Sequence, residues 1–209
     1  MKTPVVFSVF ILSLFLSCAG QYTKWEHNAS VNGLDFKKVR FSIKSGDTTM
    51  TIGYLKSSAV VGGTAISADW LHLDHEKNPV LYRLEKEREL SSFLFPAGTW
   101  IVKIPDGIAA VFPADTTIGG YLCRGGGGAN GIRTSFYSSG AIKYFYTSGV
   151  TDVGGVKCKG GTMHTISLHE NGTLSGCTLA EDHTFNGILV KKGEKVRFDE
   201  SGKVLPATR

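Results

Sequence analysis

Val153-Gly154-Gly155-Val156-Lys157-Cys158 is one copy of a pattern that recurs along the chain. In each copy, one apolar residue stands two positions before a glycine or serine anchor and another stands three positions after it. The anchors are Gly33, Gly63, Ser92, Gly120, Gly155 and Gly187, with successive spacings of 30, 29, 28, 35 and 32 residues. The apolar residues before them are Val31, Val61, Leu90, Ile118, Val153 and Phe185, and those after them are Phe36, Ile66, Phe95, Cys123, Cys158 and Val190. A period of this length predicts a repeat architecture in which neighbouring units bury one continuous core.

A second set of turn sequences follows the same period, between the anchors. Its members are Lys44-Ser45-Gly46, Lys77-Asn78-Pro79, Pro105-Asp106-Gly107, Ser138-Ser139-Gly140, Glu170-Asn171-Gly172 and Glu200-Ser201-Gly202. Turns this close together leave room only for short strands, and the alternation of apolar and polar residues in 162–168 and 195–198 is typical of half-buried strands. We therefore predict an all-β fold for residues 31–209, an elongated antiparallel β-hairpin repeat stack of about six units of roughly 31 residues. Whether the stack is an open ribbon or a closed solenoid stays undecided.

Two segments depart from this pattern. Val80–Leu90 has strong helix formers at helical spacing, yet Leu84–Gly98 aligns without a gap onto Leu179–Gly193. We predict strand there, with a helical turn inserted in one unit as the alternative. Gly125–Asn130 accounts for the long fourth spacing and is predicted to be a flexible loop between units.

The N-terminal residues have the pattern of an export signal. Pro4–Leu16 is an apolar and hydroxyl run of signal-peptide length, too short to span a bilayer, and Ser17-Cys18 follows it. This resembles the lipobox of bacterial lipoproteins, although Phe15 stands where that box usually has leucine. We predict a lipoprotein signal peptide over 1–17, lipidation of Cys18 and a tether over 18–30, with membrane attachment through the N-terminal lipid. The alternative is cleavage after Ala19 and secretion as a soluble protein.

Composition excludes some classes of function. The chain has 209 residues, of which 42% are apolar, so it can bury a real core and is not a disordered polymer. Lys and Arg number 23 against 18 Asp and Glu, a mild excess that argues against a dedicated nucleic-acid-binding protein. We expect no nucleic-acid partner.

Three later stretches carry a resemblance to known repeats. They are Phe136–Ile142, Leu168–Leu174 and Phe198–Val204, which share an aromatic or aliphatic residue, a turn glycine and a following aliphatic residue. They resemble MORN-like hairpin repeats, and Cys177–Asp182 with Asn186-Gly187 is similar to the repeat of surface lipoproteins from leptospires. The Tyr-x-Gly-x-Trp core of eukaryotic MORN units is absent, so their phosphoinositide binding is not carried over. The resemblance implies an outer-membrane, cell-surface β-repeat lipoprotein of the kind that includes virulence-associated adhesins, and no catalytic residue comes with it.

The three cysteines after Cys18 leave two interpretations open. Cys123 and Cys158 share a phase of the repeat, so their side chains should lie in one column. Either they pack as small buried residues or they form a disulfide, which an exported protein permits. Cys177 stands at another position of the repeat and has no partner in this scheme. It is either a buried thiol or a minor candidate for pairing.

Catalytic and metal-binding patterns are weak. His72-Leu73-Asp74-His75-Glu76 is the best metal-like cluster, but on a strand His72 and Asp74 face one side and His75 the other. No nucleophile elbow, zinc-protease motif or phosphate loop is present. We expect a non-enzymatic protein without a cofactor or a metal.

Charge supplies the only hint about ligands. Residues 18–119 contain 11 basic and 11 acidic residues, whereas 120–209 contain 11 basic and 7 acidic ones. The basic residues that recur with the repeat or extend it are Arg124, Lys159, Lys191, Lys192, Lys195 and Arg197. They predict a basic ladder for sulfated glycans, acidic host proteins or the lysine pockets of plasminogen, unless they only keep a β-stack soluble.

The sequence therefore predicts an adhesin for host extracellular matrix or plasminogen. The alternative is an envelope scaffold that faces the periplasm and binds bacterial proteins. A third hypothesis is an enzyme for a small substrate, built around the glycine-rich loop.

Overall fold

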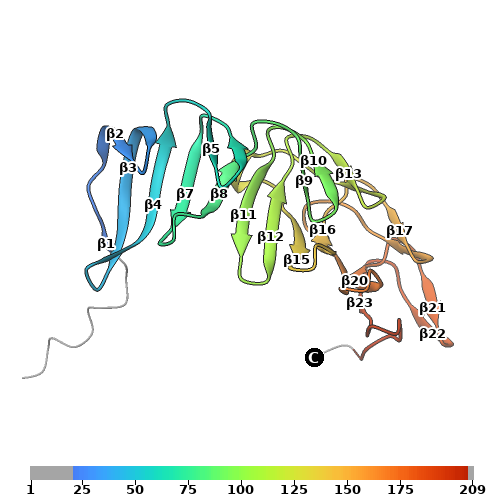
Figure 1. Cartoon of the computed structure of the whole chain (residues 1–209). Helices are drawn as coiled ribbons and strands as arrows, with labels where there is room; N and C mark the ends of the chain where they lie inside the picture. Colours follow the sequence, from blue (N-terminus) through green and yellow to red (C-terminus); the bar gives the residue numbers. More distant parts are fainter. Residues whose placement is uncertain (1–20, 207–209) are drawn as a thin grey trace, which may run out of the picture.

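The computed structural model describes residues 21–206 (Figure 1), and the predicted signal peptide and Cys18 lie outside them. Most strands belong to one antiparallel sheet of 13 strands. Its members are β1 (Gln21–Tyr22), β2 (Glu26–Val31), β3 (Leu34–Lys44), β4 (Asp47–Leu55), β7 (Trp70–Asp74), β8 (Pro79–Arg83), β11 (Trp100–Ile104), β12 (Gly107–Val111), β15 (Thr134–Tyr137), β16 (Ile142–Phe145), β19 (Ile166–Leu168), β20 (Leu174–Thr178) and β23 (Lys195–Arg197). From β3 onward they pair in chain order, while β1 and β2 both pair with β3.

Five small two-stranded hairpins connect successive strand pairs of the sheet. They are β5 (Ala59–Val61) with β6 (Thr64–Ile66), β9 (Arg88–Leu90) with β10 (Phe93–Phe95), β13 (Thr116–Ile118) with β14 (Tyr121–Cys123), β17 (Thr151–Val153) with β18 (Val156–Cys158), and β21 (His183–Phe185) with β22 (Ile188–Val190). Figure 1 shows the sheet curving from β2 and β3 at its blue end to β23 at its red end. The predicted all-β stack of hairpin units is confirmed, and the stack is an open sheet.

The predicted anchors lie at the hairpin tips. Both residues of every two-residue tip have positive φ, from 49° at Asn186 to 85° at Gly120 and Gly155. This is the geometry of type I′ turns, which match the twist of the strands they join. Ser91 and Ser92 adopt it without a glycine, with φ of 54° and 63°.

The apolar residues that flank the anchors form the core. Phe36, Ile66, Phe95, Cys123 and Cys158 are fully buried. The remaining flanking residues are buried in the same cluster or packed against it; they are Val31, Val61, Leu90, Ile118, Val153, Phe185 and Val190. The hairpins thus cover one face of the sheet with a continuous apolar layer, as the repeat predicts.

Close packing between hairpin and sheet depends on a glycine in the first unit. Gly53 lies in β4 beneath the Phe36 ring, and a Cβ there would stand 2.3 Å from the ring. In the middle of the stack, Phe95 packs edge-on against Phe112, with 5.5 Å between ring centroids. Large side chains fill the layer because their partners on the sheet leave room for them.

We call the face opposite the hairpins the open face, although Ile52, Ala109 and Ser135 on it are buried. Cross-strand pairs place one row of residues on it, because directly paired residues share a face. The row consists of Arg40, Ile52, His72, Leu81, Val102, Ala109, Ser135, Tyr144, Ser167, Gly176 and Arg197. Sequence neighbours of row members, such as Val39, Ile101 and Val196, are buried in the core. We call this row the Arg40–Arg197 row.

The structure also describes most of the expected tether, residues 80–90 and the glycine-rich insertion. The expected tether is wrong from Gln21 onward, because β1 pairs with Ser42 and Ile43 and β2 pairs with Leu34–Val39. Val80–Leu90 contains most of β8 and the whole of β9 and no helix, as predicted. The glycine-rich insertion is a loop with a single 3-10 turn, Gly128–Asn130, which contacts β11 and β12.

Candidate functional site

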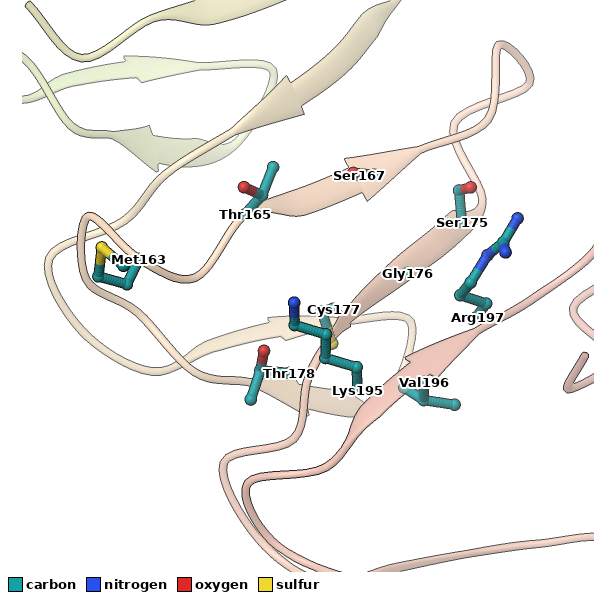
Figure 2. A pocket seen from close by; sticks show the side chains of 10 residues that line it. All are labelled: Met163, Thr165, Ser167, Ser175, Gly176, Cys177, Thr178, Lys195, Val196 and Arg197. Atoms are coloured by element: carbon teal, nitrogen blue, oxygen red, sulfur yellow. The ribbon is translucent and has the colours of Figure 1, made fainter. Parts of the chain in front are cut away.

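A shallow cleft at the C-terminal end of the open face collects two of the predicted basic residues. Its volume is about 280 Å³. Figure 2 shows its lining, which comes from β19, β20, β23 and the segment that precedes β19: Met163, Thr165, Ser167, Ser175, Gly176, Cys177, Thr178, Lys195, Val196 and Arg197. Lys195 and Arg197 alternate on β23 and share a face, opposite Thr178 and Gly176. The cleft therefore presents two cations beside several hydroxyl groups, a combination suited to an oxyanion.

Lys159 lies beside this cleft. Its backbone N–H donates to the Thr178 carbonyl over 2.7 Å, and Thr178 is also the cross-strand partner of Lys195. Lys159 and Lys195 therefore flank one residue, and both are exposed. Neither makes an ion pair among residues 21–206.

The structure does not join all six predicted residues into one ladder. Arg124 donates its backbone N–H to Tyr146, a place equivalent to that of Lys159 but one unit earlier. Lys191 instead pairs with Asp182 at 3.0 Å, and the backbone N–H of Lys192 donates to the same carboxylate. These hydrogen bonds lower the pKa of Asp182, the one from Lys192 most and the one from Lys191 next. The sequence could not place Asp182 because strand pairing at the last hairpin decides which lysine it meets.

Of the two alternatives for Cys123 and Cys158, the disulfide between them is wrong, and buried packing holds for Cys123 alone. Cys158 is bonded to Cys177, with 5.7 Å between their Cα atoms, and Cys123 is a buried free thiol. Equivalent residues of adjacent units are two sheet strands apart, which is roughly 10 Å and too far for a disulfide. The end of β18 instead bridges to Leu179, which brings the neighbouring Cys177 within reach. Burial raises the pKa of the Cys123 thiol to about 11.

The histidine-rich stretch does not gather metal ligands. His72 and Asp74 lie on the open face, whereas His75 is exposed in the turn after β7. Within residues 21–206, no group of three or more His, Cys, Asp or Glu side chains is placed to hold a metal ion. His72 also lines an apolar groove of about 490 Å³ with Met50, Leu81 and Val102. Its pKa is lowered, first by burial and then by the charge of Arg40.

One cluster on the open face is absent from the predicted sites. Lys37, Lys38 and Arg40 lie over the rings of four aromatic residues at the N-terminal end of the sheet: Tyr22, Trp25, Tyr54 and Trp70. We call these seven residues the N-terminal ladder. Residues 18–119 have equal numbers of basic and acidic residues, so the charge distribution did not indicate this cluster. The alternation of Lys38 and Arg40 on one strand is the signal that could have found its cations.

Comparisons with protein-family models, with curated protein sequences and with solved structures found no match to the chain. The resemblance to MORN-like lipoproteins therefore stays a prediction that rests on the residues quoted for it. No helix within residues 21–206 is long and apolar enough to cross a membrane.

Proposed function

We propose that the chain is an exported surface lipoprotein that binds acidic partners without transforming them. The closest fit is an adhesin for extracellular-matrix components or plasminogen. The observation that carries this proposal is the cleft in which Lys195 and Arg197 share a face with the hydroxyl groups of Ser167 and Thr178. The export-type pattern of the N-terminus supports this proposal, because an exported surface lipoprotein would meet host molecules.

The arrangement of the cleft supports binding more than catalysis. Its cations come from one strand and its hydroxyls from neighbouring strands, so all of them lie on a single, nearly flat face. None of the residues within 21–206 that line the cleft is a histidine, aspartate or glutamate, so this described lining offers no carboxylate or imidazole as a general base. An extended acidic chain can lie across such a face and pair with several cations at once.

Solid-phase binding tests the proposal. Mature protein is offered laminin, fibronectin, heparin and plasminogen, and we expect binding that weakens as salt is added, because the attraction is between exposed charges. Replacing Lys195 and Arg197 together by glutamine should weaken it about tenfold or more, since each lost charge-assisted contact is worth about 1.5–3 kcal/mol. The matched control replaces the exposed Lys56 and Lys86, which lie away from the cleft.

Two results would contradict the proposal. The electrostatic site is contradicted if none of the four partners binds. It is also contradicted if the affinity changes neither with salt concentration nor with the double substitution. Protection of the protein from protease on intact cells would place it inside the envelope, where the scaffold alternative applies instead.

A further inference from the structure

The N-terminal ladder holds cations and rings in alternation. The Arg40 guanidinium lies 4.4 Å from the ring centroid of Tyr22 and 4.5 Å from that of Trp25. The Lys38 ammonium lies 5.2 Å from Trp25 and 4.9 Å from Trp70. Arg40 and Lys38 therefore each contact two rings, whereas Lys37 lies over Tyr54 alone, and these contacts fix the cations before any ligand arrives.

These cations have no acidic partner in the described part of the chain. None of the five ion pairs there involves Lys37, Lys38 or Arg40. The nearby Asp69 is engaged by Arg83 at 3.3 Å. Glu26 is paired in register with Val39, so it points to the other face of the sheet.

Arg40 is also incompletely satisfied. Its Nε atom is shielded from solvent and donates no hydrogen bond. Stacking between rings leaves the edge of a guanidinium as its only donor surface, and that edge matches the two oxygens of an oxyanion. Because Nε itself is out of reach, an incoming anion would be bound by the terminal N–H groups of the guanidinium, which are not among the shielded, unpaired atoms.

We propose that the N-terminal ladder binds the sulfate or carboxylate groups of an acidic glycan. Anionic groups on a sugar fit because they need only the N–H donors of the Arg40 guanidinium and the Lys38 ammonium. A single-stranded nucleic acid would stack its bases on open ring faces, but Lys38 and Arg40 already lie over the Trp25 ring and Lys38 lies over the Trp70 ring. His27, the cross-strand partner of Lys38, lies on the same face and adds a donor to the site.

The ladder and the C-terminal cleft stand at the two ends of the Arg40–Arg197 row. Ten interstrand steps of about 4.8 Å separate them, roughly 48 Å along the sheet. A long acidic glycan can therefore engage both sites, and the second contact then forms at a high effective concentration. The ligand class, but not the site, rests on the proposed function.

The test measures binding of short fragments, which reach one site only. Heparin and hyaluronan fragments of equal length are titrated against the mature protein, which separates sulfate from carboxylate recognition. We expect Arg40→Gln and Lys38→Gln each to weaken binding of the preferred fragment by about five- to tenfold. Lys44→Gln, at the exposed end of the same strand, should leave it unchanged. Acetylation of the wild-type protein is mapped in parallel, and the fragment should protect Lys38 more than Lys44.

The outcomes separate this inference from the proposed function. Equal acetylation of Lys38 with and without the fragment overturns the inference even if the variants fail to fold. Fragment binding lost only in the Lys195 and Arg197 variant overturns it while leaving the proposed function intact. Tighter binding of a single-stranded oligonucleotide than of either glycan would contradict the ligand class.

Discussion

Ser91 and Ser92 form the hairpin tip that departs from the glycine rule of the repeat. Both adopt the left-handed region, which favours glycine because a Cβ there crowds the backbone. Every other anchor position carries a glycine. Phe95, which follows this tip, is fully buried, so core packing holds the hairpin against the sheet.

Relief of that strain gives a prediction. Ser92→Gly should raise the free energy of unfolding by about 0.5–1 kcal/mol, the gain from a relaxed φ less the added entropy of the unfolded chain. Urea denaturation measures it. The control is Ser139→Gly. Ser139 lies in a turn of the sheet and has no positive φ, so glycine there relieves no strain and should lower the free energy of unfolding. A loss in Ser92→Gly would show that the serine side chain stabilises the tip.

His72 makes stability depend on pH. Burial and Arg40 keep its pKa below the ordinary value of 6.5. As the pH falls through 6.5, the unfolded chain therefore takes up a proton that the folded chain does not, and the folded state loses stability. Chemical denaturation between about pH 7 and about pH 5 should show this fall, and His72→Gln should reduce its slope. His75→Gln, at an exposed turn, should keep the slope of the wild type. An unchanged slope in His72→Gln would contradict the assignment.

Each hairpin is an element that ties two neighbouring pairs of sheet strands together. After each hairpin the chain returns to the sheet. Two backbone hydrogen bonds show this: Arg124 N–H donates to the Tyr146 carbonyl, and Lys159 N–H donates to the Thr178 carbonyl. In the fourth hairpin the disulfide between Cys158 and Cys177 reinforces the same junction. The crosslink therefore joins the hairpin layer to the sheet within the C-terminal part of the stack.

The crosslink has a measurable effect. Replacing Cys158 and Cys177 together by alanine should lower the free energy of unfolding by about 3 kcal/mol, the value for a loop of this length. Mass spectrometry of non-reduced peptides should find these two linked and Cys123 as a thiol. Cys123 should alkylate slowly in the folded protein, because its pKa is about 11 and its side chain is buried. A link between Cys123 and Cys158 would refute the pairing.

The whole molecule is a linear array, so its ends have fewer neighbours than its middle. Phe95 in the central layer is fully buried, whereas Val190, the equivalent residue of the last hairpin, is only partly buried. In such an array, stability is the sum of contacts between adjacent units. The terminal units therefore lack one of their two interfaces.

Local stability should follow this gradient. Amide hydrogen exchange, read by mass spectrometry, should be slowest in β11, β12 and β15 and faster toward β2 and β23. The N-terminal ladder should slow exchange in β1 and β2 relative to β21 and β22, because cation–π contacts hold the first strands against β3. Uniform protection along the chain would contradict a stack with independent end units.

The repeat was readable in the amino-acid order because it depends on local chemistry. Turn glycines and the apolar residues beside them specify each hairpin without reference to distant parts of the chain, so the anchors, the core columns and the all-β stack follow from them. Which side chains meet across units could not be read this way. The Cys158–Cys177 bond, the pairing of Lys191 with Asp182 and the N-terminal ladder all join residues that strand order and register bring together. A local pattern fixes which face a side chain occupies, but its neighbours on that face are fixed only by the pairing of the whole sheet.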